Sequence, residues 1–395
     1  MTKQVWQVER FSTDVTSQIQ SMRYSTGRRT QFDSWSPGSL VFTIRNDNGQ
    51  ANGYDLNDRI TLTATGSFWY QWFFVQEVLF DDRGGDGGGS SATIVCTDLL
   101  GRLGRVSVFE QSIGSQPTLQ QIDTEFSPYL PASTFQFFSN GDSTASAEAS
   151  YTGTALNRFN LNMTTEQGWI NINQEYISMF SRSDLDDLAG PLVFNRDGSG
   201  LGTVLAYFDI KRIALGSNYL NTCTVIPPTA AQQNSTNATG VAAYGTYGAE
   251  FATVDNSQAQ ALSFAQWQVE SRSDPDELSF QISVSDTANS LLGYFDELFF
   301  NHGVVTVWYQ NPGSGTTLTS QQIVQGWSMT VTPSRTDMEI FTSPLTYTNF
   351  FTLDSATFGI LGGSAVATYN QDIRYSKSTF TYNGEFANAG GRLGW

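Results

Sequence analysis

Residues 39–49 read Ser-Leu-Val-Phe-Thr-Ile-Arg-Asn-Asp-Asn-Gly. The first seven are rich in β-branched and aromatic side chains, a composition typical of a strand. The last four, 46–49, are residues that tight turns prefer. Apolar strands that end in such turns recur along the chain, so the sequence predicts a β-dominated fold.

Further strands are predicted on both sides of this segment. Residues 68–78, Phe-Trp-Tyr-Gln-Trp-Phe-Phe-Val-Gln-Glu-Val, form a long aromatic run, and we expect a central strand buried on much of both faces. The strands 169–172 and 176–180 flank a short turn and predict a hairpin. The other strands are predicted at 59–63, 92–96, 204–211, 221–226, 278–284, 304–309, 322–332 and 337–342.

Helices are predicted where apolar residues return every three or four positions. Leu156, Phe159 and Met163 give one apolar face to a helix that begins at a threonine cap, 152 or 154, and ends near residue 168. Other helical segments are expected at 98–103, 257–269 and 289–300. The segments 111–151 and 227–240 show little periodicity, and we interpret them as a boundary region and a polar loop.

The two ends of the chain share an order of strands. Residues 39–45, 58–63, 68–78 and 92–96 correspond in order to 278–284, 304–309, 322–332 and 337–342. One interpretation is an internal repeat of a β unit. The other is a chance likeness, because any two β barrels can be aligned this loosely.

Composition limits the classes of function. A chain of 395 residues is long enough for two or more packed units. Its formal net charge of −17 argues against a surface that grips nucleic acid, although an acidic channel would suit DNA that must pass without binding. Cys96 and Cys223 lie in apolar strand-like runs, and we expect buried free thiols rather than a disulfide. No apolar run approaches the roughly 20 residues that span a bilayer, so no membrane-spanning segment is expected.

The sequence offers little for catalysis. His302 is the one histidine and follows an apolar helical segment, which removes Ser-His-Asp and His-ligated metal sites. A pair of carboxylates could be drawn from Asp184, Asp186 and Asp187 or from Asp81 and Asp82. Acidic clusters in polar loops are more typical of solvated surfaces. The turns at 46–49 and 195–198 lack the rest of a calcium loop. We therefore predict no enzyme, no catalytic or metal residues and no cofactor.

Several short motifs resemble, in their order and spacing, the minor tail proteins of long-tailed (siphovirus-like) bacteriophages, the baseplate hub or tail-tip type. They are Gly27-Arg28-Arg29, residues 38–46, Val95-Cys96-Thr97-Asp98-Leu99-Leu100, Thr154-Ala155-Leu156 with 165–170, Tyr244-Gly245, and 351–355 with 359–362. The chain departs from that family at Ala242-Ala243 and in the Ser-Thr-Ala segment 141–150. Some tail-tip relatives bind an iron-sulfur cluster through four cysteines. This chain has two cysteines, which are too few for such a cluster.

The resemblance implies a β-dominated α+β fold with two tail-tube-like β-barrel domains and smaller inserted α/β pieces. The first barrel would occupy 1–110 and be completed by about 204–250, with an inserted α/β domain at 111–203. The second barrel would occupy 251–345, and 346–395 would form a C-terminal segment.

The implied function is a structural hub that closes the tail tube, adapts its sixfold symmetry to a threefold tip and forms part of the DNA exit channel. Its partners would be two further copies in a homotrimer, the distal tail or tail tube protein, the tape measure protein and tail fibre or tip proteins, with DNA only as transiting cargo. It would be located at the tail tip of the virion after synthesis in the host cytoplasm. The alternatives are a receptor- or carbohydrate-binding tail protein and a tail-associated cell-wall hydrolase.

Overall fold

The computed structural model describes residues 6–65, 69–81, 89–130, 135–137, 139–173, 176–186, 192–196, 203–214, 218–273, 278–285, 304–310 and 315–344. The statements below concern these residues. His302, the helix expected at 289–300 and the motifs beyond residue 350 lie outside them.

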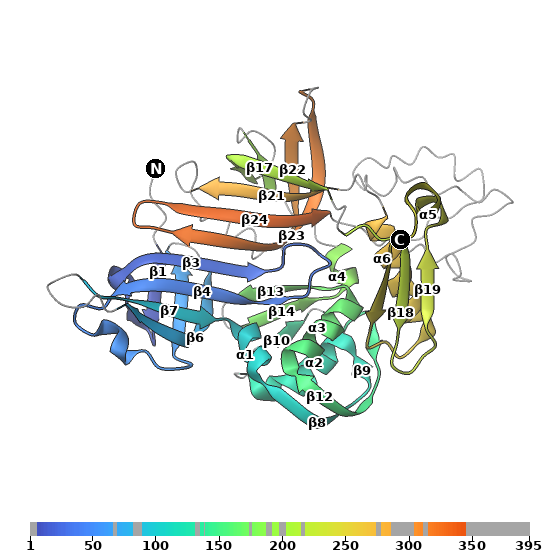
Figure 1. Ribbon diagram of the computed structural model, residues 1–395, viewed down its shortest axis with the longest axis horizontal. Coiled ribbons are helices and arrows are strands. Elements are labelled where there is room, and N and C mark those ends of the chain that lie inside the picture. The colour runs from blue at the N-terminus through green and yellow to red at the C-terminus, as the bar shows by residue number, and fades with distance from the viewer. Residues whose placement is uncertain are drawn as a thin grey trace. The chain divides into compact units, whose positions relative to one another are not determined.

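The largest sheet holds 14 of the described strands (Figure 1). Its main order is β16-β15-β22-β23-β3-β4-β7-β6-β5-β1-β2, and β24, β21 and β17 follow one another from β23. The strands are β1 (Trp6–Arg10), β2 (Thr13–Asp14), β3 (Ile19–Gly27), β4 (Ser36–Arg45), β5 (Arg59–Ala64), β6 (Tyr70–Asp81), β7 (Ser91–Thr97), β15 (Leu192–Asn195), β16 (Thr203–Ala206), β17 (Asp209–Ala214), β21 (Leu278–Ser285), β22 (Val304–Gln310), β23 (Thr317–Val331) and β24 (Thr336–Pro344). The predicted β-dominated character is confirmed.

The sheet contains one strand pattern twice. In the first half the strands run β4-β7-β6-β5, and in the second half they run β21-β24-β23-β22, with every neighbouring pair antiparallel. These are the strands, in the same correspondence, that the sequence predicted as a repeat. Each half also has an outer strand at the same place, β3 on β4 and β17 on β21. The predicted repeat of strand order is therefore confirmed for the described strands.

The side-chain burial repeats along with the strand order. Leu40, Phe42 and Ile44 of β4 are buried, and so are their equivalents in β21, Phe280, Ile282 and Val284. The alternation in both strands is the period of two that buries one face of a sheet. All six residues belong to one continuous core that also includes side chains of β7, β22, β23 and β24.

A β-bulge lies at the same place in each half. In β6, Val75 pairs with Cys96 and Glu77 with Val95, so Gln76 is the extra residue. In β23, Val324 pairs with Thr342 and Gly326 with Phe341, so Gln325 is the extra residue. A bulge bends its strand and increases the local twist. In both halves the strand before the bulge pairs with the strand expected from the repeat, β5 or β22.

No closed barrel is found among the described residues, so the expected division into two tail-tube-like β-barrel domains stays a prediction. The sheet branches at β23 and passes from one half to the other where β23 pairs with β3, and among the described strands its ends are β16, β17 and β2. The stretch 204–250 was expected to complete the first barrel, and its first two strands, β16 and β17, pair instead with β15 and with β21 of the second half. Main-chain pairing across the halves was not visible in the sequence because it is set by long-range register.

Residues 99–186 form a smaller α/β part. Its helices are α1 (Leu99–Arg105), α2 (Thr118–Phe126), α3 (Ala155–Glu166) and α4 (Arg182–Asp186), and α3 packs against both α1 and α2. Its strands are β8 (Ser107–Ile113), β9 (Gln116–Pro117), β10 (Phe135–Phe137), β11 (Thr144–Ala145), β12 (Glu148–Thr154), β13 (Trp169–Asn173) and β14 (Tyr176–Phe180). The predicted helix with its Thr154 cap and the predicted hairpin are confirmed.

The interpretation of 111–151 as a boundary region was wrong. The segment contains α2, whose Leu119, Ile122 and Phe126 are fully buried. Their spacing of three and four residues is a helical signal, hidden by the many Ser, Thr and Ala residues around it.

Residues 218–273 form a third part. The three-stranded sheet β19-β18-β20 consists of β18 (Thr222–Ile226), β19 (Gln233–Thr236) and β20 (Gly248–Ala252), and α6 (Gln258–Arg272) packs on it. The predicted helix at 257–269 is confirmed, with Ser257 as its cap. The polar loop expected at 227–240 instead contains β19 and the start of α5 (Ala238–Tyr244).

Candidate functional site

Two glycines face each other where the halves of the large sheet meet. Gly326 of β23 lies opposite Gly27 of β3. A Cβ on Gly27 would lie 2.3 Å from the carbonyl oxygen of Gln325, and one on Gly326 would lie 2.4 Å from the carbonyl oxygen of Thr26. Gly27 also has a φ of +79°, which side chains disfavour. The junction between the halves therefore requires glycine at both positions.

Arg28, next to this pair, forms hydrogen bonds with the bulge residue Gln325 of β23. Its backbone N–H donates to the carbonyl of Gln325 at 2.9 Å, and its Nε donates to Oε1 of the same residue at 2.8 Å. Its guanidinium carbon lies 4.1 Å from the ring centre of Trp35. Burial lowers the pKa of Arg28 to about 9. The motif Gly27-Arg28-Arg29 thus marks the contact between the two halves.

Asp98 joins two other motifs. Its Oδ2 accepts from the N–H of Gly38 at 2.8 Å, and its Oδ1 accepts from the N–H of Gly101 at 3.2 Å, which caps α1. The Asp98 N–H donates back to the Gly38 carbonyl. Because Asp98 is fully buried, its pKa is raised to about 7. Asp98 therefore holds the start of β4 against the helix that follows β7.

Two residues at the end of α3 form hydrogen bonds with neighbouring segments of the chain. Glu166 accepts hydrogen bonds from the Thr118 hydroxyl at the start of α2 and from the N–H groups of Asp142 and Ser143. Burial raises the pKa of Glu166 to about 7. Thr165 accepts from the N–H of Val254 at 3.0 Å, in the segment that leads into α6. The resemblance motif at 165–170 thus begins with two residues that connect separate parts of the fold.

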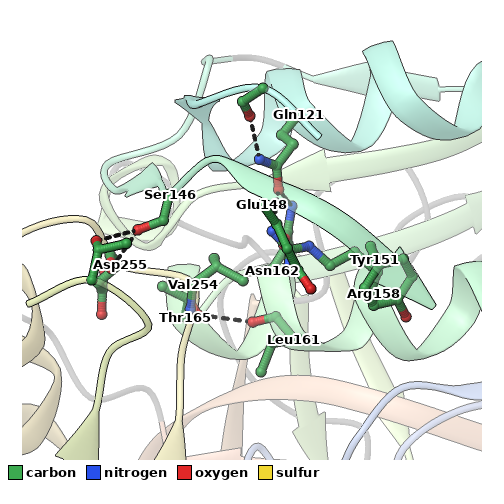
Figure 2. A network of polar contacts seen from close by, with 12 residues as sticks. Gln121, Ser146, Glu148, Tyr151, Arg158, Leu161, Asn162, Thr165, Val254 and Asp255 are labelled. Carbon is green, nitrogen blue, oxygen red and sulfur yellow. Dashed lines mark hydrogen bonds and ion pairs between the residues drawn. The ribbon is translucent and has the colours of Figure 1, made fainter. Parts of the chain in front are cut away.

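Figure 2 shows the polar contacts around α3. Arg158 donates to Glu148 at 2.7 Å and to Gln121 of α2 at 3.1 Å, and Asn162 also donates to Gln121. Close by, the Ser146 hydroxyl donates to the carbonyl of Asp255 at 3.0 Å. These contacts join β12, α2 and α3 to one another and to the segment before α6.

Two of the five carboxylates considered for catalysis lie in α4, and a third lies at the end of β6. Asp184 in α4 accepts from the hydroxyl of Ser139 at 2.9 Å and from the N–H of Ser181 at 2.7 Å, so it stabilises a turn. Asp186 is the last residue of α4, and Asp81 is exposed at the end of β6. Asp82 and Asp187 lie outside the described residues.

Both cysteines are buried and free, which confirms the prediction of thiols. Burial raises the pKa of both, to about 12 for Cys223, so neither is a reactive thiolate at neutral pH. Among the described residues, no three His, Cys, Asp or Glu side chains form a group that could hold a metal ion. The described helices include none that is long and apolar enough to cross a membrane.

We expect stability to fall as the pH rises from 5 to 8. The folded-state pKa of Glu166, about 7, lies above its ordinary value of 4.5, so the folded chain binds the proton more tightly than the unfolded chain does. The stability that this proton contributes is present below pH 4.5 and is lost as the pH passes through about 7. Asp98 and Asp255, with pKa values of about 7 and about 6, act in the same direction.

Urea denaturation at pH 5 and pH 8 measures this effect. Glu166→Gln should reduce the difference in the free energy of unfolding between the two pH values by on the order of 2 kcal/mol. Glu148→Gln is the control, because the Glu148 side chain is 40% exposed and forms an ion pair with Arg158, whereas Glu166 is buried. An unchanged pH dependence in Glu166→Gln would contradict the assignment.

Comparison with protein-family models and with curated proteins gives no match. Comparison with solved structures gives clear likenesses. A tail protein from Neisseria meningitidis has 10% identity and a TM-score of 0.59, over 87% of this chain and 97% of its own. The 43 kDa tail protein of prophage MuSo2 from Shewanella oneidensis has 10% identity and a TM-score of 0.56, over 87% of this chain and 99% of its own.

A third similar structure comes from a secretion system. It is an Escherichia coli protein described as a component of the type VI secretion system with structural similarity to T4 bacteriophage tail proteins, at 9% identity and a TM-score of 0.50, over 83% of this chain and 73% of its own. At such low identities these likenesses show the fold alone. The chain therefore has the fold of phage tail proteins and of a related secretion component.

The sequence motifs contain these residues, but their spacing does not show which of them contact one another. Gly38 and Asp98 were noted in separate motifs 60 positions apart, and the hydrogen bond between them appears only in the folded chain. Asp98 did carry a usable signal, since an Asp before an apolar helical run is a common helix cap.

Proposed function

We propose that this protein is a structural hub of a phage tail tip. In this proposal it closes the end of the tail tube, adapts sixfold to threefold symmetry and forms part of the channel through which DNA leaves. The observation that carries the proposal is the repeated strand pattern, because one chain presents the same sheet unit twice.

The repeated unit would allow one trimer to match both sixfold and threefold symmetry. Three chains with two similar units each present six units, and such a trimer matches a sixfold tube on one side and a threefold tip on the other. The fold shared with tail proteins supports a place in a tail. The net charge of −17 suits a channel that DNA crosses without binding.

The proposed partners follow from that position. They are two further copies of the chain, the distal tail or tail tube protein, the tape measure protein and fibre or tip proteins. The proposed location is the tail tip of the virion, and we assign no enzymatic activity, cofactor or metal. We retain 1–110, 111–203 and 251–345 as the proposed division into two open, barrel-like units and an insertion, with 203–214 assigned to the second unit by its strand pairing.

Imaging of assembled particles at subunit resolution tests the proposal. We expect three copies in a ring at the end of the tail tube, around an opening wide enough for duplex DNA. Copies found only on peripheral fibres would overturn the hub and favour a receptor-binding role. A wall-degrading activity lost on substitution of Asp184 would instead favour the hydrolase.

A further inference from the structure

The pairing of β23 with β3 shows how one copy of the repeated unit joins the next. After its bulge, β23 lies antiparallel to β3, with Trp327 opposite Thr26, Met329 opposite Tyr24 and Val331 opposite Met22. Residues Tyr24, Met329 and Trp327 are buried there. The second unit thus uses the outer edge of β23 to bind the outer strand of the first unit.

The same two edges occur once more, and no described strand pairs with either of them there. The equivalent of the second half of β23 is the second half of β6, residues 77–81, which among the described strands pairs with β7 alone. The equivalent of β3 is β17, which pairs with β21 alone. In one chain, therefore, the first unit has an edge equivalent to that of β23, and the second unit has an edge equivalent to that of β3.

The repeat fixes which residues are equivalent. Gly326 and Glu77 each follow the bulge, opposite the equivalent residues Phe341 and Val95. Tyr24 pairs with Leu40 and Arg212 pairs with Phe280, and Leu40 and Phe280 occupy the same place in β4 and β21. Transferring the β23–β3 register to the other two edges pairs Val78 with Ala214, Leu79 with Ile213, Phe80 with Arg212 and Asp81 with Lys211.

The apolar side chains at these edges are unusually exposed. Leu79 and Phe80 are each 49% exposed and Ile213 is 43% exposed. In the transferred register Leu79 and Ile213 lie directly opposite, on the same face of the sheet, where their contact would remove both from water. A sheet edge with exposed apolar residues is a template for pairing with another chain.

The charges at the two edges are complementary. The β6 edge carries Glu77 and Asp81, and the β17 edge carries Lys211 and Arg212 with Asp209 at its start. Lys211 is one of three lysines in a chain of net charge −17, so two adjacent basic residues at this edge are a local exception. The register places Asp81 opposite Lys211 and Phe80 opposite Arg212, an ion pair and a cation–π pair.

We propose that the edge of β6 at Val78–Asp81 in one copy pairs antiparallel with β17 in a second copy of this chain. The contact is head to tail, because the two edges differ, and such contacts generate a ring if the rotation closes. This inference rests on the proposed function, which requires a ring of three chains, and it adds the surface and the register that join them. Each junction between chains then repeats the β23–β3 junction within a chain.

Disulfide trapping tests the register in the full chain. Purified Leu79→Cys and Ile213→Cys proteins are mixed, oxidised mildly and separated without reductant, while the oligomeric mass is measured by light scattering. Directly opposed residues of antiparallel strands have Cα atoms about 4.5–5.5 Å apart, within the range that a disulfide spans. We expect a cross-linked dimer from the mixture and none from Ile213→Cys alone.

The matched control is Leu79→Cys mixed with Arg212→Cys, one position out of register and on the opposite face of the strand. Equal cross-linking of the control pair, or a trimer that forms without the expected cross-link, would overturn this interface and leave the hub proposal standing. Monomers in the light-scattering measurement, with no cross-link, would overturn both.

Charge reversal provides a second measurement. Lys211→Glu should weaken association by about tenfold, because it places two carboxylates opposite each other. The exchanged protein Asp81→Lys with Lys211→Asp should recover most of that loss. Association unaffected by Lys211→Glu would contradict the proposed register.

Discussion

Gly326→Ala is expected to destabilise the fold by about 3 kcal/mol, since the new methyl group has no room at the junction between the two halves of the sheet. The added Cβ would lie 2.4 Å from the carbonyl oxygen of Thr26, and 2.8 Å and 2.9 Å from the backbone oxygen and nitrogen of Arg28. These are backbone atoms, so no rotation of a side chain relieves the clash. Relief requires β23 to move away from β3, which breaks the pairing that unites the two units.

Gly248→Ala is the matched control, the same change in another strand. A Cβ at Gly248 would meet only ordinary contacts, at 3.7 Å and 4.0 Å, and Gly248 is exposed. We expect the free energy of unfolding of Gly248→Ala to change by less than about 1 kcal/mol. Alanine lowers the conformational entropy of the unfolded chain, which acts to stabilise this variant. Urea denaturation of both variants measures the difference, and equal stability of the two would show that the halves are not packed as described.

Asp98→Ala should have the second large effect, also about 3 kcal/mol. It removes the cap of α1, worth about 1 kcal/mol, and leaves the buried N–H of Gly38 without its acceptor, at a cost of about 1–3 kcal/mol. The substitution also frees the start of β4 from the helix after β7. Thermal and urea unfolding measure the loss.

Ser257→Ala is the control for this prediction. Ser257 caps α6 by accepting a hydrogen bond from the N–H of Gln260 at 3.2 Å. Among the described residues it accepts no second bond like the one that Asp98 accepts from Gly38. Its loss should therefore cost about 1 kcal/mol, the cap alone. If Asp98→Ala is no more destabilising than Ser257→Ala, the bond to Gly38 contributes nothing.

Some local elements were predictable because their signals are short-range. The alternation in β4, the Thr154 cap with the apolar spacing of α3, and the pairing of β13 with β14 each involve fewer than about 20 consecutive residues. The helix α2 was missed although Leu119, Ile122 and Phe126 have helical spacing, since polar and small residues surround them. Local propensity describes such segments poorly when tertiary packing supplies most of the stability.

The sequence by itself determined the β-dominated class and the free thiols, and it offered an internal repeat of strand order as one of two interpretations. The tertiary structure alone decided that the two strand sets form one sheet rather than separate barrels, that β17 belongs to the second set, and that Asp98 binds Gly38. The physical reason is that alternation and capping depend on neighbours in the chain. Strand partners and buried polar contacts depend on register between residues as far apart as Gly27 and Gly326, which no local pattern specifies.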